Sequence, residues 1–278
     1  MLSRPLAAWL PRLTLFAVIC GGGILGAISA AQPPTGTVAT QAGGALQPFA
    51  ATYALDWHGI TAGYATLTLA HVSGDIYQYT SNDRARGIFR IAFPDPIHEA
   101  STLRFTAGHV VPLTYREDNG SEHANQDVTL TFDWADMRVL GMAGDKHVDQ
   151  PLQAGTQDPL SVQVELMHDL VAGQVPATFL LFDKTSANQY DYTREGTETL
   201  DTPLGQLDTV IYRSDRPGYD RVLRLWLAPS LGYLPVQAER RRKGKVEFAL
   251  HIRELQRPAA QASSATSSSG QGAGPSQP

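Results

Sequence analysis

The sequence predicts a mainly β protein, with a large curved antiparallel sheet or incomplete barrel of roughly a dozen strands and one packed α-helix. Apolar residues between positions 49 and 256 recur with period two, which indicates strands that have one buried and one solvated face. Because parallel strands are usually covered on both faces, this pattern favours antiparallel pairing. Turn-forming residue pairs recur at hairpin spacing, and a sheet of this size must curl or pair with another.

The clearest strands lie at the beginning, middle and end of this region. The first spans residues 49–57, and a tight turn at His58-Gly59 leads into a second over residues 60–70. The same alternation marks residues 128–134 and 246–253. The apolar face of the first strand consists of Phe49, Ala51, Tyr53, Leu55 and Trp57. The expected turns are Gly74-Asp75, Ala107-Gly108, Asn119-Gly120, Gly144-Asp145, Pro217-Gly218 and Lys243-Gly244.

One segment has helical periodicity. Asp158 is suited to the N-cap, Pro159 to the first helical position and Gly173 to the stop. The apolar face of this helix is formed by Leu160, Val164, Met167 and Val171. A second, shorter helix is expected over residues 85–93, where Pro94 would end it.

The two ends of the chain differ from the middle. Residues 1–31 resemble a signal peptide, with Arg4 and Arg12 near an apolar stretch that closes with small residues; an uncleaved N-terminal anchor is the alternative. Residues 32–47 are expected to be a disordered linker and residues 257–278 a disordered Ser/Gly-rich tail. A single β-rich domain is expected over residues 48–256. This organisation predicts export to the periplasm. The alternative is an exported protein that its N-terminal segment anchors in the membrane.

Charge and cysteine content exclude several classes of protein. The chain has a formal charge of −5, and residues 47–256 carry 27 acidic and 19 basic side chains, a balance of −8. Nucleic-acid-binding domains are typically basic, so we expect no nucleic acid partner. The only cysteine, Cys20, lies in the export segment, which excludes an intrachain disulfide and a multi-cysteine metal site.

The sequence shows no catalytic constellation, and we predict no catalytic, cofactor-binding or metal-binding residues. His98-Glu99 does not continue as the HExxH pattern of zinc proteases. His147 and Asp149 share a strand face without a visible third ligand. Asp95, His98 and Glu99 are expected to be solvated at a turn and strand start. Ser161 and Ser214 are candidate nucleophiles by residue type alone.

Two basic segments suggest contacts with other molecules. Arg240, Arg241, Arg242, Lys243 and Lys245 straddle Gly244 and are expected at a hairpin tip, where they could bind acidic lipid headgroups or form a solvated face. The second segment could cover the open mouth of the sheet, touch a membrane, or pack its aromatic rings on the core. It consists of Arg84, Arg86 and Arg90 around Ile88, Phe89 and Phe93.

Five stretches of the chain resemble domain-of-unknown-function family 3108, a group of exported proteins. They run in the family's order over about 190 residues: 51–69, 85–87, the GTQDPLS stretch at 155–161, the TPLGQLDT stretch at 202–209, and 225–239. The resemblance implies an exported β-rich domain of a Gram-negative-type envelope. It supplies no catalytic residue to carry over. The long Ser-rich tail departs from the family pattern.

These observations favour a non-enzymatic envelope module that binds an apolar ligand or a partner segment on its curved sheet. A structural or interaction module in envelope assembly is the alternative, and a hydrolase without a recognisable motif is the third reading. The partners expected are a lipid or other apolar ligand, another envelope protein, and peripheral contact with a membrane. The ligand-binding residues stay unknown at this level.

Overall fold

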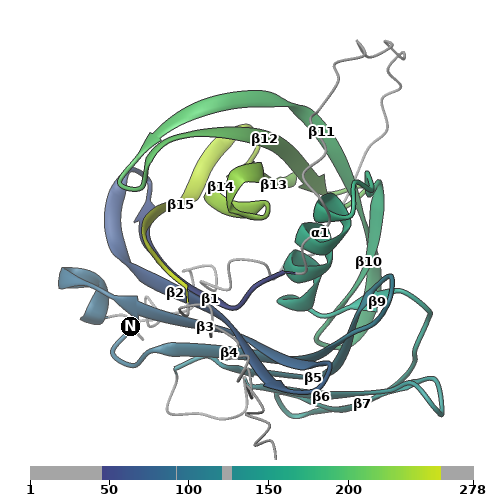
Figure 1. Ribbon diagram of the computed structural model, residues 1–278. Helices are drawn as coiled ribbons and strands as arrows, with labels where there is room; N and C mark the ends of the chain where they lie inside the picture. The colour runs from purple at the N-terminus through teal and green to yellow at the C-terminus, as the bar shows by residue number, and fades with distance from the viewer. Residues whose placement is uncertain (1–45, 92, 121–126, 258–278) are drawn as a thin grey trace, which may run out of the picture.

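The computed structural model describes residues 46–91, 93–120 and 127–257. The predicted signal peptide, nearly all of the predicted linker and nearly all of the predicted tail lie outside the described residues. Every strand of the described residues belongs to one sheet, which curls into an open barrel (Figure 1).

The sheet is an antiparallel meander, apart from one short parallel pair between β9 and β10. Its order is β8-β7-β6-β5-β4-β3-β2-β1-β15-β14-β13-β12-β11-β10-β9, so the pairing of β1 with β15 places the first and last strands at its centre. The strands are β1 (Phe49–Trp57), β2 (Ile60–Ser73), β3 (Ile76–Ala85), β4 (Ile97–Phe105), β5 (Val110–Asp118), β6 (Val128–Asp133), β7 (Arg138–Ala143), β8 (Lys146–Pro151), β9 (Thr156–Gln157), β10 (Thr178–Asp183), β11 (Ser186–Thr202), β12 (Gly205–Asp215), β13 (Arg221–Ala228), β14 (Leu234–Arg242) and β15 (Lys245–Gln256).

The two edges of the sheet, β8 and β9, do not pair with each other. Side-chain packing closes the barrel instead. Phe132 of β6 contacts Phe182 of β10, with 6.2 Å between the ring centroids. The Gln157 amide donates a hydrogen bond of 2.8 Å to the Val110 carbonyl, which links β9 to β5. The helix α1 (Ser161–Val171) lies inside the curve of the sheet, beside β10 (Figure 1).

The predicted fold class is confirmed, and the period-two pattern identifies the inner face of the sheet. In β1 the predicted apolar positions alternate with more exposed ones, and only Trp57, at the end of the strand, is not fully buried. Tyr53 is fully buried and donates a hydrogen bond of 2.8 Å to the Pro235 carbonyl. Fifteen strands form rather than roughly a dozen, because short strands leave little pattern: β9 has two residues, and β8 buries only Val148.

The Asp158 side chain accepts hydrogen bonds at the start of the helix, as expected of a capping residue, but the N-cap position is Leu160 and α1 begins at Ser161, two residues after the predicted Pro159. Both Leu160 and Ser161 donate backbone N–H groups to Asp158 Oδ1 at 2.8 Å, which satisfies the helix N-terminus. Gly173 adopts a φ of 75° directly after the C-cap. Residues of α1 on all sides are buried, since the helix fills the barrel interior between β5 and β10.

Two local predictions are wrong. The segment predicted as a helix over residues 85–93 forms only a short 3₁₀ helix, η2 (Gly87–Ile91), which buries none of its residues. Its Gly87 has a φ of 57°, which breaks a continuous helix at that point. Asn119-Gly120 is not a two-residue hairpin turn, because β5 ends at Asp118 and β6 begins only at Val128. Gly120 is needed for packing instead: a Cβ atom there would lie 2.7 Å from the Pro96 carbonyl.

Within the described part of the chain, no helix combines the length and the apolar character that a membrane crossing requires.

Candidate functional site

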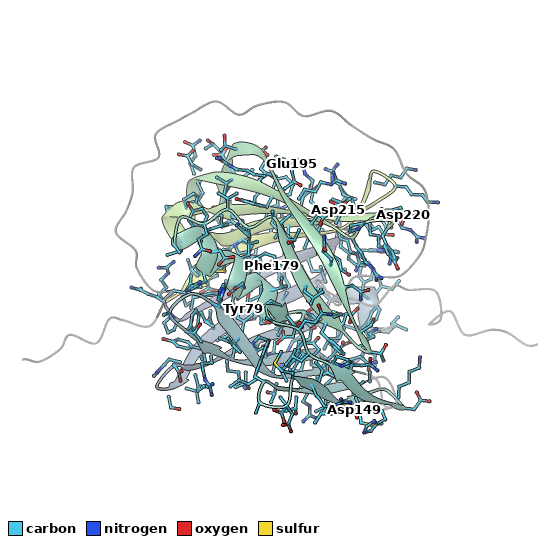
Figure 2. The ribbon with its side chains drawn as sticks, turned by 90° about the vertical axis from the view of Figure 1, so that its right-hand side faces the viewer. Tyr79, Asp149, Phe179, Glu195, Asp215 and Asp220 are labelled. Atoms are coloured by element: carbon cyan, nitrogen blue, oxygen red, sulfur yellow. The ribbon has the colours of Figure 1, made fainter. Side chains whose placement is uncertain are left out.

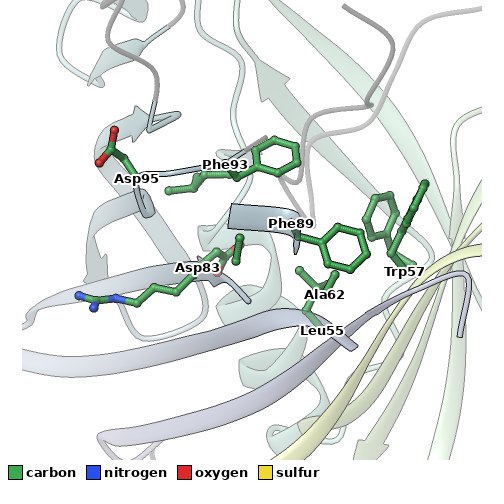
Figure 3. A pocket seen from close by; sticks show the side chains of 11 residues that line it. Leu55, Trp57, Ala62, Asp83, Phe89, Phe93 and Asp95 are labelled. Carbon is green, nitrogen blue, oxygen red and sulfur yellow. The ribbon is translucent and has the colours of Figure 1, made fainter. Parts of the chain in front are cut away.

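A narrow apolar slot opens at one end of the barrel, which we call the slot end. The β1–β2 turn, the β3–β4 connection with η2, and the β14–β15 turn meet there. The cavity volume is about 20 Å³, enough for about one water molecule, so the side chains nearly close it. Figure 3 shows the slot from close by. Its apolar lining consists of Leu55, Trp57, Ala62, Ala85, Phe89, Phe93, Ile97 and Phe248, and Asp83, Arg84 and Asp95 complete it.

The strand register places the aromatic rings of the slot together. Trp57 of β1 is the direct partner of Phe248 on β15, and both belong to or pack against the hydrophobic core. Phe89 of η2 meets Trp57 edge to face, with 5.6 Å between the ring centroids. Gly63 lets β2 approach the backbone of Arg84, since a Cβ atom would lie 2.3 Å from the Arg84 carbonyl oxygen. The aromatic residues of the second basic segment, Phe89 and Phe93, line the slot.

Arg240 lies buried beside the slot, and the half-buried Arg221 lies near the same carboxylate, Glu247; we call Arg221 and Arg240 the arginine pair. The Arg240 guanidinium stacks on the Phe248 ring, 4.4 Å from its centroid, so it shares this ring with the slot. Only 9% of the Arg240 side chain is exposed. The sequence predicts that the whole basic run is exposed at a hairpin tip. Arg240 is buried instead, whereas Lys243 and Lys245 are exposed as expected.

The inward direction of Arg240 follows from its place on β14. Leu234, Val236 and Ala238 are buried at alternate positions, and Arg240 is the next residue in that series. A register shift between Arg240 and Arg241 accommodates an extra residue, Glu247, on β15. The shift lets the Glu247 carboxylate reach the arginine pair.

The arginine pair has more positive charge than its surroundings neutralise. Glu247 Oε2 lies 3.6 Å from the Nε atoms of both Arg221 and Arg240, beyond hydrogen-bond distance. Two nitrogen atoms of each guanidinium are buried without a hydrogen-bond acceptor. Burial lowers the pKa of Arg240 to about 10, against the opposing effect of Glu247. Because an arginine stays protonated at neutral pH, the group carries a net charge of +1 and has free donors for an anion.

Arginines on the outer face of β12 and β13 form ion pairs with nearby carboxylates. Arg224 donates to Glu195 at 2.6 Å, and Arg213 lies 3.3 Å from Asp215. Glu195 and Asp215 lie among the strands on the upper side of the molecule in Figure 2. The unmet donors of the arginine pair are therefore not a general property of the arginines on β12–β14.

Four carboxyl groups lie buried across the barrel interior, and we call Asp83, Glu99, Glu117 and Asp158 the acid wall. Glu99 on β4 is the direct cross-strand partner of Glu117 on β5. Burial, and then the proximity of Glu117, raise the pKa of Glu99 well above its ordinary range, although a 2.6 Å hydrogen bond from the Tyr115 hydroxyl opposes the shift. Burial and the nearby Glu117 therefore both favour the neutral form of Glu99.

Hydrogen bonds from serine hydroxyls hold the two aspartates of the acid wall. Ser81 donates to Asp83 at 2.8 Å, and Ser101 donates to Asp158 at 2.5 Å. Burial raises the pKa of each aspartate to about 6, in spite of these hydrogen bonds. Asp83 also lines the slot, so the acid wall reaches the base of the candidate site.

The structure separates the polar residues that the sequence grouped together. Asp95 and His98 are exposed as expected, but Glu99 is buried, because it follows Ile97 on the inner face of β4. His147 and Asp149 lie on β8 at the periphery, where Asp149 pairs with Arg138 (Figure 2). Ser161 accepts a hydrogen bond from the Asp158 backbone at the helix start, and Ser214 is buried on β12.

Sequence reasoning missed Arg240 and Glu99 for the same reason. Both residues are charged, and both occupy a period-two position whose neighbours in the series are buried. The alternation of β14 was a sufficient signal for Arg240, but the run of basic residues suggested a solvated tip instead. The partners of each residue come from other strands, so no local pattern could identify them.

One solved structure agrees with this architecture. The chain is similar to a β-barrel-like protein of domain-of-unknown-function family DUF1849 from Brucella abortus, with 13% identity, coverage of 77% of this chain and 98% of that chain, and a TM-score of 0.51. At this identity the likeness shows the fold alone. The chain also matches MucB (12% identity, 78% and 55% coverage, TM-score 0.33) and a protein with a YmcC-like fold from Bacteroides fragilis NCTC 9343 (12%, 76% and 96%, 0.35).

No curated protein matches the sequence. A family profile does match, and it covers residues 52–248, nearly all of the described barrel. This agrees with the resemblance carried by the five stretches of sequence. The chain belongs to the family described as "Protein of unknown function (DUF3108)".

Proposed function

We propose that this protein is an exported, non-enzymatic module of the cell envelope that binds an amphipathic molecule at the slot end of its barrel. The apolar chain of the ligand occupies the slot, and its acidic head pairs with Arg221 and Arg240. Export rests on the N-terminal sequence, which has an apolar stretch over residues 13–30 and no acidic residue before Asp56. The periplasm is the compartment proposed.

The observation that carries the proposal is the arginine pair beside an aromatic slot. A buried guanidinium loses its hydration and cannot be neutralised by deprotonation, so burial without an acceptor is costly. The fold nevertheless keeps two nitrogen atoms of Arg240 unpaired against Phe248. A carboxylate or phosphate would accept these donors and balance the charge of +1.

The slot must widen to admit an alkyl chain. The 3₁₀ helix η2 covers it, buries none of its own residues and contacts Trp57 through the ring of Phe89. Displacement of η2 would therefore break few apolar contacts and expose the lining of the slot (Figure 3). The buried area of a chain next to Trp57 and Phe248 would offset that cost.

The rim of the slot supports delivery from a membrane surface. Ile88 is 75% exposed and Ile91 is 84% exposed, and both lie on η2. Arg84, Arg86 and Arg90 are exposed on the same segment. Exposed isoleucines beside basic side chains fit the interface of an anionic lipid layer, with the apolar groups among the acyl chains and the guanidiniums at the phosphates.

Two other readings receive less support. A hydrolase would need a reachable nucleophile, whereas Ser161 takes part in the cap of α1 and Glu99 lies beneath Tyr115. An assembly module that recruits partners through its sheet edge would use β8, but Lys146, Asp149 and Pro151 are the kinds of residue that block edge pairing.

Ligand titrations test the proposal with a matched pair of lipids. A long-chain fatty acid supplies the anionic head, and the alcohol of the same chain length supplies the neutral control. We expect the full chain to bind the fatty acid in a 1:1 complex, followed by native mass spectrometry and by intrinsic tryptophan fluorescence, to which Trp57 in the slot contributes. Arg240→Met keeps the packing on Phe248 and should weaken fatty-acid binding by about 10- to 100-fold, the effect of losing charged hydrogen bonds, while alcohol binding stays unchanged.

Two further variants separate the slot from the arginine pair. Ala62→Leu narrows the slot and should weaken binding of both the acid and the alcohol. Arg241→Met removes a neighbouring charge that pairs with Glu239, away from the arginine pair, and should leave binding unchanged. The proposal fails if the folded protein binds neither lipid, or if Arg240→Met and Arg241→Met weaken fatty-acid binding equally.

A further inference from the structure

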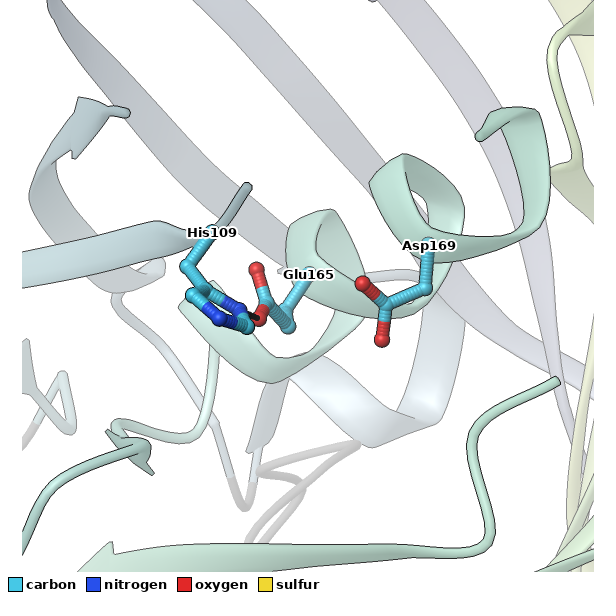
Figure 4. Close-up of side chains that lie close together, drawn as sticks. All are labelled: His109, Glu165 and Asp169. Atoms are coloured by element: carbon cyan, nitrogen blue, oxygen red, sulfur yellow. Dashed lines mark hydrogen bonds and ion pairs between the residues drawn. The ribbon is translucent and has the colours of Figure 1, made fainter. Parts of the chain in front are cut away.

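A second group of polar side chains lies at the opposite end of the barrel from the slot. His109 precedes β5, and Glu165 and Asp169 are one turn apart on α1. One ligand atom from each of the three side chains lies within 4.8 Å of the other two. Figure 4 shows the three side chains and the contact between His109 and Glu165. The group lies where α1 faces the beginning of β5.

Glu165 is already fixed in position by the strand it faces. Its Oε2 atom accepts the Val110 backbone N–H at 2.5 Å, and its Oε1 atom lies 3.1 Å from His109 Nδ1. The orientation of the carboxylate is therefore set by β5. His109 contributes the exposed side of the group, since 73% of its side chain is accessible.

Asp169 supplies an independent observation that points to a ligand. Its side chain is only 9% exposed, and its Oδ1 atom is buried without a hydrogen-bond donor. The neighbouring His168 Nδ1 lies 3.9 Å away, beyond hydrogen-bond distance. A carboxylate oxygen that is buried without a donor is costly unless a cation reaches it. Asp169 points toward the side of α1 where Glu165 and His109 lie (Figure 4).

We propose that His109, Glu165 and Asp169 form a binding site for one divalent transition-metal ion, with Zn²⁺ as the ion that fits best. One imidazole and two carboxylates are ligands that zinc accepts, and a water molecule would complete four-coordination. Calcium and magnesium take oxygen ligands and make little use of an imidazole. The site is separate from the slot and does not depend on the proposed lipid binding.

The geometry needs only a small adjustment to hold the ion. Atoms bound to zinc at about 2.0–2.1 Å in a tetrahedral arrangement are roughly 3.4 Å apart, which is closer than the 4.8 Å limit of the group. The exposed His109 follows the turn that Thr106 closes with a 2.8 Å hydrogen bond to the His109 carbonyl, so its ring can rotate inward without moving β5. The bound ion would then cross-link α1, through Glu165 and Asp169, to the β4–β5 connection, through His109.

Metal titration of the full chain, freed of metal by a chelator, tests this proposal. We expect calorimetry to show one Zn²⁺ per chain, Ca²⁺ to bind far more weakly, and Zn²⁺ to raise Tm. His109→Ala and Asp169→Asn should each weaken zinc binding by about 10-fold or more and abolish the rise in Tm. His109 is exposed, so its replacement leaves the core intact and keeps the test valid if Asp169→Asn fails to fold.

His147→Ala is the matched control, because this histidine is exposed on β8 away from α1. It should bind Zn²⁺ as the wild type does. Absence of saturable zinc binding would overturn the proposal, as would equal binding by the wild type and His109→Ala. A third contrary result is Ca²⁺ binding as tight as Zn²⁺ binding, which would indicate an acidic patch without a role for the imidazole.

Discussion

The inner surface of the barrel buries ionisable groups in two regions. The two regions differ in how the charge of these groups can be neutralised. The acid wall consists of three carboxyl groups on β3–β5 and of Asp158, just before α1. Three of its four members accept hydrogen bonds from the hydroxyl groups of Ser81, Ser101 and Tyr115. The arginine pair on β13 and β14 has a single carboxylate between two guanidiniums and several unmet donors. A carboxyl group can become neutral by binding a proton, whereas a guanidinium cannot lose its proton at any relevant pH.

This difference assigns different roles to the two regions. Protonation, together with the hydrogen bonds from Ser81, Ser101 and Tyr115, can stabilise the acid wall without a partner from outside. The arginine pair has no such route and needs an anion, which is why we place the ligand head there. Three measurements test this difference between the acid wall and the arginine pair.

The largest expected effect is the pH dependence of stability that arises from the acid wall. The folded-state pKa of Asp83 is raised from 3.8 to about 6, so the folded protein binds more protons than the unfolded chain between these values. The contribution of Asp83 to the free energy of unfolding is therefore fully present below about pH 4. It is lost as the pH rises through 6 and stays absent at higher pH. The shift corresponds to a loss of about 3 kcal/mol for Asp83, and Asp158 behaves in the same way.

Denaturant unfolding from pH 4 to pH 8 measures this dependence. Asp83→Asn keeps the hydrogen bond from Ser81 and removes the titration, so its stability should decline less with pH than that of the wild type. Asp145→Asn, at an exposed turn, should follow the wild type. Parallel curves for the wild type and Asp83→Asn would show that Asp83 does not titrate as the acid wall requires.

The second effect concerns the arginine pair. Glu247→Gln leaves two buried guanidiniums without a carboxylate and should lower the free energy of unfolding by about 3 kcal/mol. Replacement of Arg240 by Met in the same chain should recover part of the loss. Glu195→Gln, which removes the partner of Arg224 on the outer face, should cost about 1 kcal/mol or less. Equal losses for Glu247→Gln and Glu195→Gln in chemical denaturation would contradict the distinction between inner and outer arginines.

The smallest effect is expected inside the acid wall. Burial favours the neutral form of Glu99, and a glutamine side chain at the same position could accept the same hydrogen bond from the Tyr115 hydroxyl. Glu99→Gln should therefore change the free energy of unfolding by less than about 1 kcal/mol. A loss comparable to that of Glu247→Gln at pH 7 would mean that Glu99 carries a charge, and the contrast between the two regions would disappear.

Local patterns of the sequence determined much of the fold. The alternation of β1 predicts its buried face, Asp158 predicts the cap of α1, and Gly173 predicts its end. These features depend on residues a few positions apart, because side-chain direction in a strand and hydrogen bonding at a helix end are local properties. The family resemblance was likewise visible from short stretches of sequence.

The candidate sites were decided by tertiary structure. Arg240 meets Arg221 and Glu247 through the pairing of three strands and a register shift. His109 reaches Glu165, 56 positions along the chain, only because α1 enters the open barrel. The sequence determined the strand alternation and the turns. Which charged side chains share the interior depends on long-range register, since a shift of one residue would turn them outward.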